Sequence, residues 1–364
     1  MSVRNDRMVF RRGSALALID GGREARGGPR VEGEVSVRFQ DLLIDPYAIE
    51  AAERVASPIL FVDLAAAPAQ GEPVHLPGVP VVGIGDRRHP LAEYLDAVID
   101  APVSAEALVR SVGKNPYASK VFVDLLRAIE GAEREASLIM ESLAYGVLQG
   151  SSEHTEWLGA REAAENAGSD GQLLLVRDEG ELRLLLHRPS ARNAIDRDLR
   201  DALVEAFTVA ALDPDIERVS LNASGPVFSI GGDLSEFGTT RDAARAHGIR
   251  MATLPARAIV RAGVRFEAHI QGACIGAGLE IVAFADRLTA EPNAWFQLPE
   301  LSMGLIPGAG GCVSVPGRIG RSRAALMVLS GRRISASKAL EWGLIDAIEE
   351  RPPIDPDAFN ADGG

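Results

Sequence analysis

The spacing of apolar residues predicts different structures for the two parts of this chain. In the first part, Ile59 to Leu64 and Val79 to Ile84 are apolar runs typical of buried strands, and a shorter strand is predicted at Val35 to Phe39. From Ser104 onward, apolar residues recur at steps of three and four. The stretch Val121 to Leu148 is therefore predicted to form one long amphipathic helix or a pair of helices.

A stretch rich in Ala, Glu and Gly, Arg161 to Gly171, is predicted to be a linker. After it the pattern alternates between strand and helix, which favours β-α-β units and a sheet flanked by helices. The predicted elements are a hairpin of Leu173 to Val176 with Leu182 to Leu186, a helix at Asp198 to Leu212 and a strand at Arg218 to Asn222. We expect an α/β protein in two parts: residues 1–170, an extension that is first α/β and then helical, and residues 171–364, the α/β core.

Composition and charge narrow the possible functions. The formal net charge is -13, and no basic stripe of the kind that binds nucleic acid is present, so no nucleic-acid partner is expected. No apolar run is long enough for a membrane span. Neither the two cysteines nor the six histidines are spaced as metal ligands, so we expect no metal site. A cytoplasmic enzyme is the default expectation.

Two glycine-rich turns are candidate ligand sites. In Phe228 to Leu234 an apparent strand ends in Gly231-Gly232 and opens a helix, and in Ile270 to Glu280 the small residues Gly276 to Gly278 lead into another helix. Glycines allow close backbone approach, and unpaired N–H groups at helix starts can hold an anion. Two such turns could direct two N–H groups at one developing oxyanion. Taken singly, the first is a common kind of turn that needs no ligand, and close helix packing is the favoured explanation of the second.

Two glutamates lie in apolar surroundings. Glu280 precedes an apolar helical segment, and Glu300 follows a proline in the segment Phe296 to Leu301. Carboxylates are seldom buried without a partner or a task, and a desolvated pair can hold one proton near neutral pH. The alternative is that Glu280 caps its own helix and Glu300 accepts a hydrogen bond from a nearby backbone N–H.

The stretch from His187-Arg188-Pro189 to Gly343-Leu344-Ile345-Asp346, about 160 residues, resembles the core of the crotonase (enoyl-CoA hydratase/isomerase) superfamily, with its motifs in the same order. The resemblance implies a crotonase-like ββα spiral core, preceded here by a mostly helical N-terminal region. It implies backbone N–H groups of Gly232 and Ala277 as the oxyanion hole, and Glu280 and Glu300 as catalytic carboxylates. Having both glutamates resembles the hydratases in particular.

The resemblance also implies residues that contact the substrate and its coenzyme A. These are Arg192, Asn193, Ala194, Ile230, Gly231, Asp233, Leu234 and Gly276. Arg188 and Arg192 are candidates for the phosphate charge, with plain surface arginine as the alternative. Asp233 is also expected to stabilise the turn and the start of its helix. No cofactor is expected, because coenzyme A enters as part of the substrate.

The sequence departs from the family near its end. Family members usually continue as helices beyond the Gly-Leu-Ile-Asp motif, whereas this chain ends at Gly364 after a tail rich in Pro and Asp. The segment Val121 to Leu158 faintly resembles those helices, which suggests a rearranged member. We expect these N-terminal helices to pack near Ile319 to Leu329 and Trp342, burying Leu125, Leu126, Leu143 and Leu148.

The leading hypothesis is reversible hydration of a 2-enoyl-CoA thioester, with a place in fatty-acid metabolism and a homotrimer or hexamer as the assembly. Alternatives within the superfamily are double-bond isomerisation and cofactor-independent acyl-CoA dioxygenation, although the dioxygenases tend to lack the Pro-Glu carboxylate. The alternative from another class is a catalytically weak scaffold whose N-terminal part docks a partner.

Overall fold

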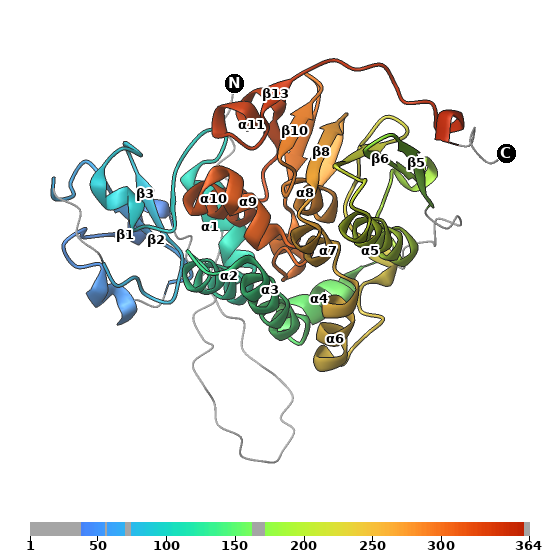
Figure 1. Cartoon of the computed structure of the whole chain (residues 1–364). Coiled ribbons are helices and arrows are strands. Elements are labelled where there is room, and N and C mark those ends of the chain that lie inside the picture. Colours follow the sequence, from blue (N-terminus) through green and yellow to red (C-terminus); the bar gives the residue numbers. More distant parts are fainter. Residues whose placement is uncertain (1–37, 55–56, 70–73, 162–171, 360–364) are drawn as a thin grey trace, which may run out of the picture.

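The computed structural model describes residues 38–54, 57–69, 74–161 and 172–359 (Figure 1). We call residues 38–161 the N-terminal region and residues 172–359 the C-terminal region. The predicted linker lies outside the described residues except for Arg161. The same holds for most of the strand predicted at Val35 to Phe39, and Phe39 itself begins a 3-10 helix, Phe39–Leu42.

The N-terminal region begins with a four-stranded parallel sheet in the order β1-β2-β3-β4. Its central strands coincide with the two apolar runs, and they are buried because neighbours cover both of their faces. The strands are β1 (Leu43–Ile44), β2 (Leu60–Asp63), β3 (Val81–Ile84) and β4 (Ala97–Val98), accompanied by the 3-10 helices Glu50–Arg54 and Pro90–Glu93.

Four helices follow this sheet, α1 (Ala105–Lys114), α2 (Pro116–Ala128), α3 (Arg134–Gln149) and α4 (Ser152–Ala160). Serine side chains fix two of their starts: Ser104 accepts the N–H of Ala107, and Ser151 accepts that of His154. The pattern over Val121 to Leu148 thus belongs to a pair of helices, one of the two predicted arrangements.

The C-terminal region is built on a six-stranded sheet in the order β13-β10-β8-β7-β6-β5. The hairpin of β5 (Gln172–Asp178) and β6 (Glu181–His187) is antiparallel as predicted, and the remaining pairings are parallel. The other strands are β7 (Arg218–Ala223), β8 (Arg265–Ile270), β10 (Arg287–Ala290) and β13 (Ala347–Ile348), and the helices α5 (Arg197–Leu212), α6 (Ala243–Thr253) and α7 (Pro255–Ala262) lie between them in sequence. The predicted α/β class is confirmed.

A third sheet and four short helices complete the C-terminal region. The sheet has the order β12-β11-β9, with β9 parallel to β11. Its strands are β9 (Ala273–Ile275), β11 (Trp295–Gln297) and β12 (Ile334–Ser335), and the helices are α8 (Ala277–Val282), α9 (Gly311–Ile319), α10 (Arg321–Ser330) and α11 (Ala336–Trp342).

The segment Phe228 to Leu234 differs from the predicted strand followed by a helix. Ser229 and Gly232 form only isolated bridges, to Cys274 and Ile195, and Leu234–Glu236 is a single 3-10 turn. The chain turns at Gly231, where φ is 96°, a conformation accessible to glycine at little cost. This positive φ interrupts the extended backbone that a strand ladder requires.

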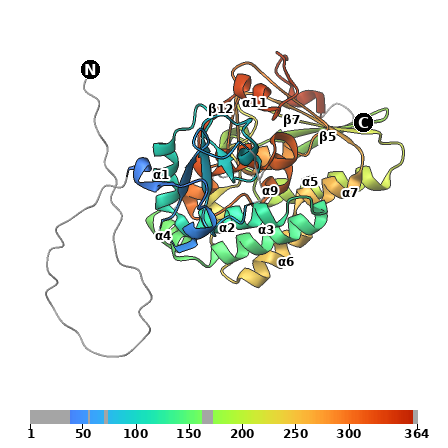
Figure 2. The ribbon, with the colours of Figure 1, turned by 90° about the vertical axis from the view of Figure 1, so that its left-hand side faces the viewer.

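One continuous apolar core joins the two regions, with buried residues from Leu42 to Ile345. Helix α2 packs on α10, while α3 packs on α6, α7 and α9, and Figure 2 shows α2, α3 and α6 along the same side of the molecule. Leu125, Leu126 and Leu148 are buried as predicted. The prediction for Leu143 is wrong: its side chain is 52% exposed, because α3 turns polar residues toward the core at this level.

Trp342 is the other predicted neighbour of the segment Val121 to Leu158. Its indole N–H donates to the carboxylate of Asp100, which precedes α1 and lies outside that segment, at 2.9 Å. None of the helices in the described ranges is long and apolar enough to cross a membrane.

Candidate active site

The two glycine turns predicted from the sequence lie against each other. The N–H of Ile275 donates to the Ser229 carbonyl at 3.0 Å, and the N–H of Ser229 donates to the Ala273 carbonyl at 3.1 Å, which aligns the two segments. A Cβ atom placed on Gly231 would lie 3.2 Å from the Ile275 carbonyl oxygen and 3.6 Å from the Cα of Gly276. Side chains at these positions would force the turns apart, so the glycines permit the close approach.

Two backbone N–H groups remain free where the turns meet. Ala277 is the first residue of α8, so its N–H has no acceptor within the helix. Across the described ranges, neither this N–H nor that of Gly232 donates to a protein acceptor. Both residues line a cavity of about 950 Å³. Each of these residues therefore carries an unused backbone donor at the lining of this cavity.

Glu280 lies on α8, one turn after Ala277, and lines the same cavity. Its Oε2 accepts hydrogen bonds from the N–H groups of Ala309 at 2.7 Å and Gly311 at 2.9 Å, so it does not cap its own helix. Burial raises the pKa of Glu280 to about 7, and these backbone donors oppose the rise. The carboxyl group can therefore exchange a proton near neutral pH.

Glu300 begins a 3-10 helix, Glu300–Met303, and is 6% exposed. A Cβ atom on Gly276 would lie 2.8 Å from its Oε1, so the carboxyl group lies directly beside the second glycine turn. Its Oε2 is buried and has no hydrogen-bond partner among the residues that the structure describes. Burial, and next the charge of Glu280, raise the pKa of Glu300 well above its ordinary value. Both effects favour the protonated form of the Glu300 carboxyl group.

A third buried glutamate, Glu141 on α3, binds the same loop as Glu280, although it is not among the residues that line the cavity and the sequence patterns did not single it out. It is 1% exposed, and its oxygens accept the N–H groups of Gly310 and Cys312, each at 2.8 Å. Apolar spacing carries no signal for an inward-facing carboxylate. The only available hint was a glutamate within an otherwise apolar helical run.

Helices α3 and α4 supply one wall of the cavity. Tyr145 packs on Gly308, where an added Cβ would lie 2.4 Å from its ring, and the guanidinium of Arg250 lies 4.7 Å from the ring centre. His154 stacks on Trp157 and binds the Met303 carbonyl through Nδ1 at 2.9 Å. The N-terminal region is thus part of the cavity itself.

The predicted coenzyme A residues fall into two groups. Arg192, Ala194, Ile230, Gly231, Asp233, Leu234 and Gly276 line the cavity. Asn193 does not: it is fully buried, accepts the N–H of Arg188 at 2.8 Å and donates to the carbonyls of Ser224 and Val227.

Arg188 is also buried, in ion pairs with Asp196 and Asp233, so its charge is already compensated. Asp233 further accepts the N–H of Ser235, as a turn-stabilising residue would.

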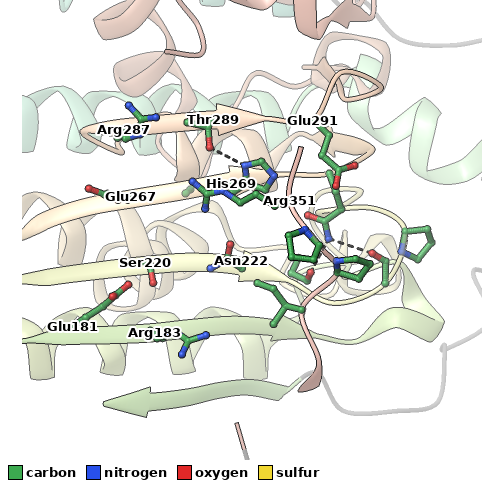
Figure 3. Close-up of a pocket in the computed structure, with 18 of the residues that line it drawn as sticks. Glu181, Arg183, Ser220, Asn222, Glu267, His269, Arg287, Thr289, Glu291 and Arg351 are labelled. Carbon is green, nitrogen blue, oxygen red and sulfur yellow. Dashed lines mark hydrogen bonds between the residues drawn. The ribbon is translucent and has the colours of Figure 1, made fainter. Parts of the chain in front are cut away.

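A second cavity, of about 710 Å³, lies between the six-stranded sheet and residues 351–354 (Figure 3). Its lining includes Ser220, His269 and Thr289, which alternate along their strands with residues of the apolar core. The Nδ1 of His269 lies 2.8 Å from the Thr289 hydroxyl. None of the site residues predicted from the sequence lines this cavity. Within the described ranges, no cluster of three or more His, Cys, Asp or Glu side chains could hold a metal ion.

Comparison with known proteins agrees with the motifs. The family model described as Enoyl-CoA hydratase/isomerase matches residues 178–354. The chain is 35% identical over 177 residues to the 2,3-dehydroadipyl-CoA hydratase of Escherichia coli (strain K12), covering 49% of this chain and 69% of that protein. It is 33% identical to the cyclohexa-1,5-dienecarbonyl-CoA hydratase of Thauera aromatica (51% and 70% covered) and to an enoyl-CoA isomerase/hydratase of Mycosarcoma maydis (46% and 65% covered).

The chain therefore belongs to the enoyl-CoA hydratase/isomerase family, which confirms the resemblance seen in its sequence. The matched segment begins at residue 178, after the four-stranded sheet and α1 to α4. Helix α3, which carries both Glu141 and Tyr145, consequently lies outside the part of the chain that the family model describes.

Proposed function

We propose that the protein catalyses the reversible addition of water to a 2-enoyl-CoA thioester. The observation that carries this proposal is that four residues line one cavity. Gly232 and Ala277 have backbone N–H groups without a protein acceptor in the described ranges, and Glu280 and Glu300 have buried carboxyl groups. The names of the E. coli and T. aromatica relatives, both hydratases acting on CoA thioesters, support it.

In the proposed reaction the thioester oxygen accepts hydrogen bonds from the N–H groups of Gly232 and Ala277. These donors stabilise the negative charge that develops on this oxygen as water attacks. Because both donors are fixed backbone groups, little reorganisation is needed when the charge appears.

Glu280 and Glu300 divide the proton transfers between them. Glu280, whose pKa is held near 7, takes a proton from water, and the water oxygen bonds to the β-carbon as the double bond opens. Glu300, whose pKa is raised well above its ordinary value, gives its proton to the α-carbon. The next turnover requires the proton on Glu280 to return to Glu300. No redox change occurs, and water and the thioester account for all atoms of the product.

Isomerisation is the second candidate, because the M. maydis relative is named an isomerase/hydratase. On the same residues it needs one proton to leave and return at different carbons, with no water added. The product mass separates these reactions, since hydration adds one water and isomerisation adds nothing.

The test replaces each carboxylate by its amide. Glu280→Gln and Glu300→Gln should each lower the hydration rate by about a hundredfold or more, the usual scale for a positioned acid or base, while thioester binding survives. Glu267→Gln, on the opposite face of the six-stranded sheet and paired with Arg265, is the matched control and should keep wild-type activity. Near wild-type turnover in both active-site variants would exclude the two-carboxylate mechanism.

A further inference from the structure

Four consecutive backbone N–H groups before and within the first turn of α9 are shared alternately by two glutamates. Ala309 and Gly311 donate to Glu280, at 2.7 and 2.9 Å, whereas Gly310 and Cys312 donate to Glu141, both at 2.8 Å. Glu280 comes from α8 and Glu141 from α3, so the segment 309–312 is held between carboxylates of the two regions. A shift of this segment at Glu141 is therefore expected to move the donors that hold Glu280.

Charged and titratable groups from several neighbouring elements surround the cluster of Glu141, Glu280 and Glu300. Burial first, and then the charge of Glu280, raise the pKa of Glu141 to about 8, against the effect of its two backbone donors. The charge of Glu141 in turn contributes to raising the pKa of Glu300. The charged and titratable groups facing this cluster are Glu280 on α8, Glu300, Cys312 on α9, Tyr145 on α3, Arg250 on α6 and His154 on α4.

The Glu141 carboxylate ties α3 to the segment that also binds Glu280. Burying an ionisable group is costly, but an apolar side chain here would leave the buried N–H groups of Gly310 and Cys312 without an acceptor. Both oxygens of Glu141 are engaged by backbone donors, so its position is fixed relative to the loop that also holds Glu280.

We propose that Glu141 is a positioning residue of the active site, which holds residues 309–312 against Glu280. The ionised form of Glu141 also opposes loss of the proton from Glu300. The proposal rests on the proposed hydration function for its catalytic consequence. The N-terminal region then affects the proton transfers through the position of Glu280, although it lies outside the segment that defines the family.

Glu141→Gln and Glu141→Asp separate the two parts of this role. Glu141→Gln removes the charge, so the pH at which Glu300 loses its proton should fall by about one unit in the resting enzyme. Glu141→Asp keeps the charge but shortens the reach, so this midpoint should stay in place. Turnover should fall about ten- to a hundredfold in both variants, the scale of a small misplacement of a catalytic group.

The midpoint is measured without substrate, from the infrared band of the protonated Glu300 carboxyl in protein labelled with ¹³C-glutamate, assigned by its loss in Glu300→Gln. Glu153→Gln is the matched control: Glu153 likewise accepts two N–H groups at a helix start, those of Tyr117 and Ala118, but these donors belong to α2 and not to the segment that binds Glu280. It should leave the midpoint unchanged.

An unchanged midpoint in folded Glu141→Gln would overturn the electrostatic part of the proposal, and wild-type turnover in Glu141→Asp would overturn the positioning part. If Glu141→Gln did not fold, Glu141→Asp would still decide: a shifted midpoint at unchanged charge would contradict the proposal. Failure of the enzyme to hydrate any thioester would refute the proposed function and leave the infrared result standing.

Discussion

Gly311→Ala perturbs the site without touching a carboxylate. A Cβ atom on Gly311 would lie 2.6 Å from Cγ and 2.8 Å from Oε2 of Glu280, and 2.8 Å from Cβ of Pro307. Because the proline is rigid, the methyl group must displace the Glu280 side chain. That movement breaks the hydrogen bonds from Ala309 and Gly311 and takes the carboxyl group away from the bound water of the proposed reaction.

The size of the effect on stability and on activity should differ. Overpacking a buried site costs about 1–3 kcal/mol, and the better helix propensity of alanine returns up to about 1 kcal/mol, so the fold should survive with a modest loss. A displacement of about 1 Å at a catalytic group costs about a hundredfold in rate, equivalent to roughly 2.7 kcal/mol in the transition state.

Turnover is followed by loss of the conjugated thioester absorbance, with thermal unfolding measured on the same samples. Gly317→Ala is the matched control, because Gly317 lies on the same helix and an added Cβ meets nothing within 4 Å. It should keep full activity and gain stability. Wild-type turnover in folded Gly311→Ala would refute the assigned position and role of Glu280.

Two further predictions concern the whole protein. Deleting residues 1–165 should leave residues 166–364 insoluble, because the deletion exposes the surface of α9 and α10 that Leu125, Leu126 and Leu148 help to cover. Burial of each of these side chains contributes roughly 1.5–3 kcal/mol to stability. A soluble, fully active fragment would contradict this prediction. The contribution of Glu141, Glu280 and Glu300 to stability should fall as pH rises from about 4.5 to 8, because their folded-state pKa values are raised above their ordinary values and folding retains protons that the unfolded chain releases. His154 and His269, whose pKa values are lowered by burial, contribute with the opposite sign. The difference between wild type and Glu300→Gln in denaturant titrations isolates Glu300, and an unchanged slope in that variant would contradict the raised pKa.

The sequence was sufficient for elements whose local pattern and environment agree. The strands β2 and β3 lie within apolar runs, and the hairpin of β5 and β6 surrounds Asp178-Glu179-Gly180, a turn sequence in which Glu179 takes a positive φ of 48°. The approach of the two glycine turns was also anticipated, because small residues were needed on both sides of that contact.

Helix α3 shows why the remainder could not be predicted. Periodicity placed Leu143 in the core, yet it is exposed while Glu141 and Ser142 are buried. The buried polar groups are satisfied by partners far away in the sequence: Gly310 and Cys312 for Glu141, and Arg250 and His247 for Ser142. Such pairings depend on tertiary contacts, so no local pattern reports them.

The most direct test of the proposed function is the mass and absorbance of a 2-enoyl-CoA thioester after incubation with the wild-type protein. We predict loss of the conjugated absorbance and a product heavier by one water, with the reverse reaction from the matching 3-hydroxyacyl-CoA. A product of unchanged mass, or no reaction across a panel of short-chain, long-chain and carboxylated enoyl-CoA thioesters, would contradict it.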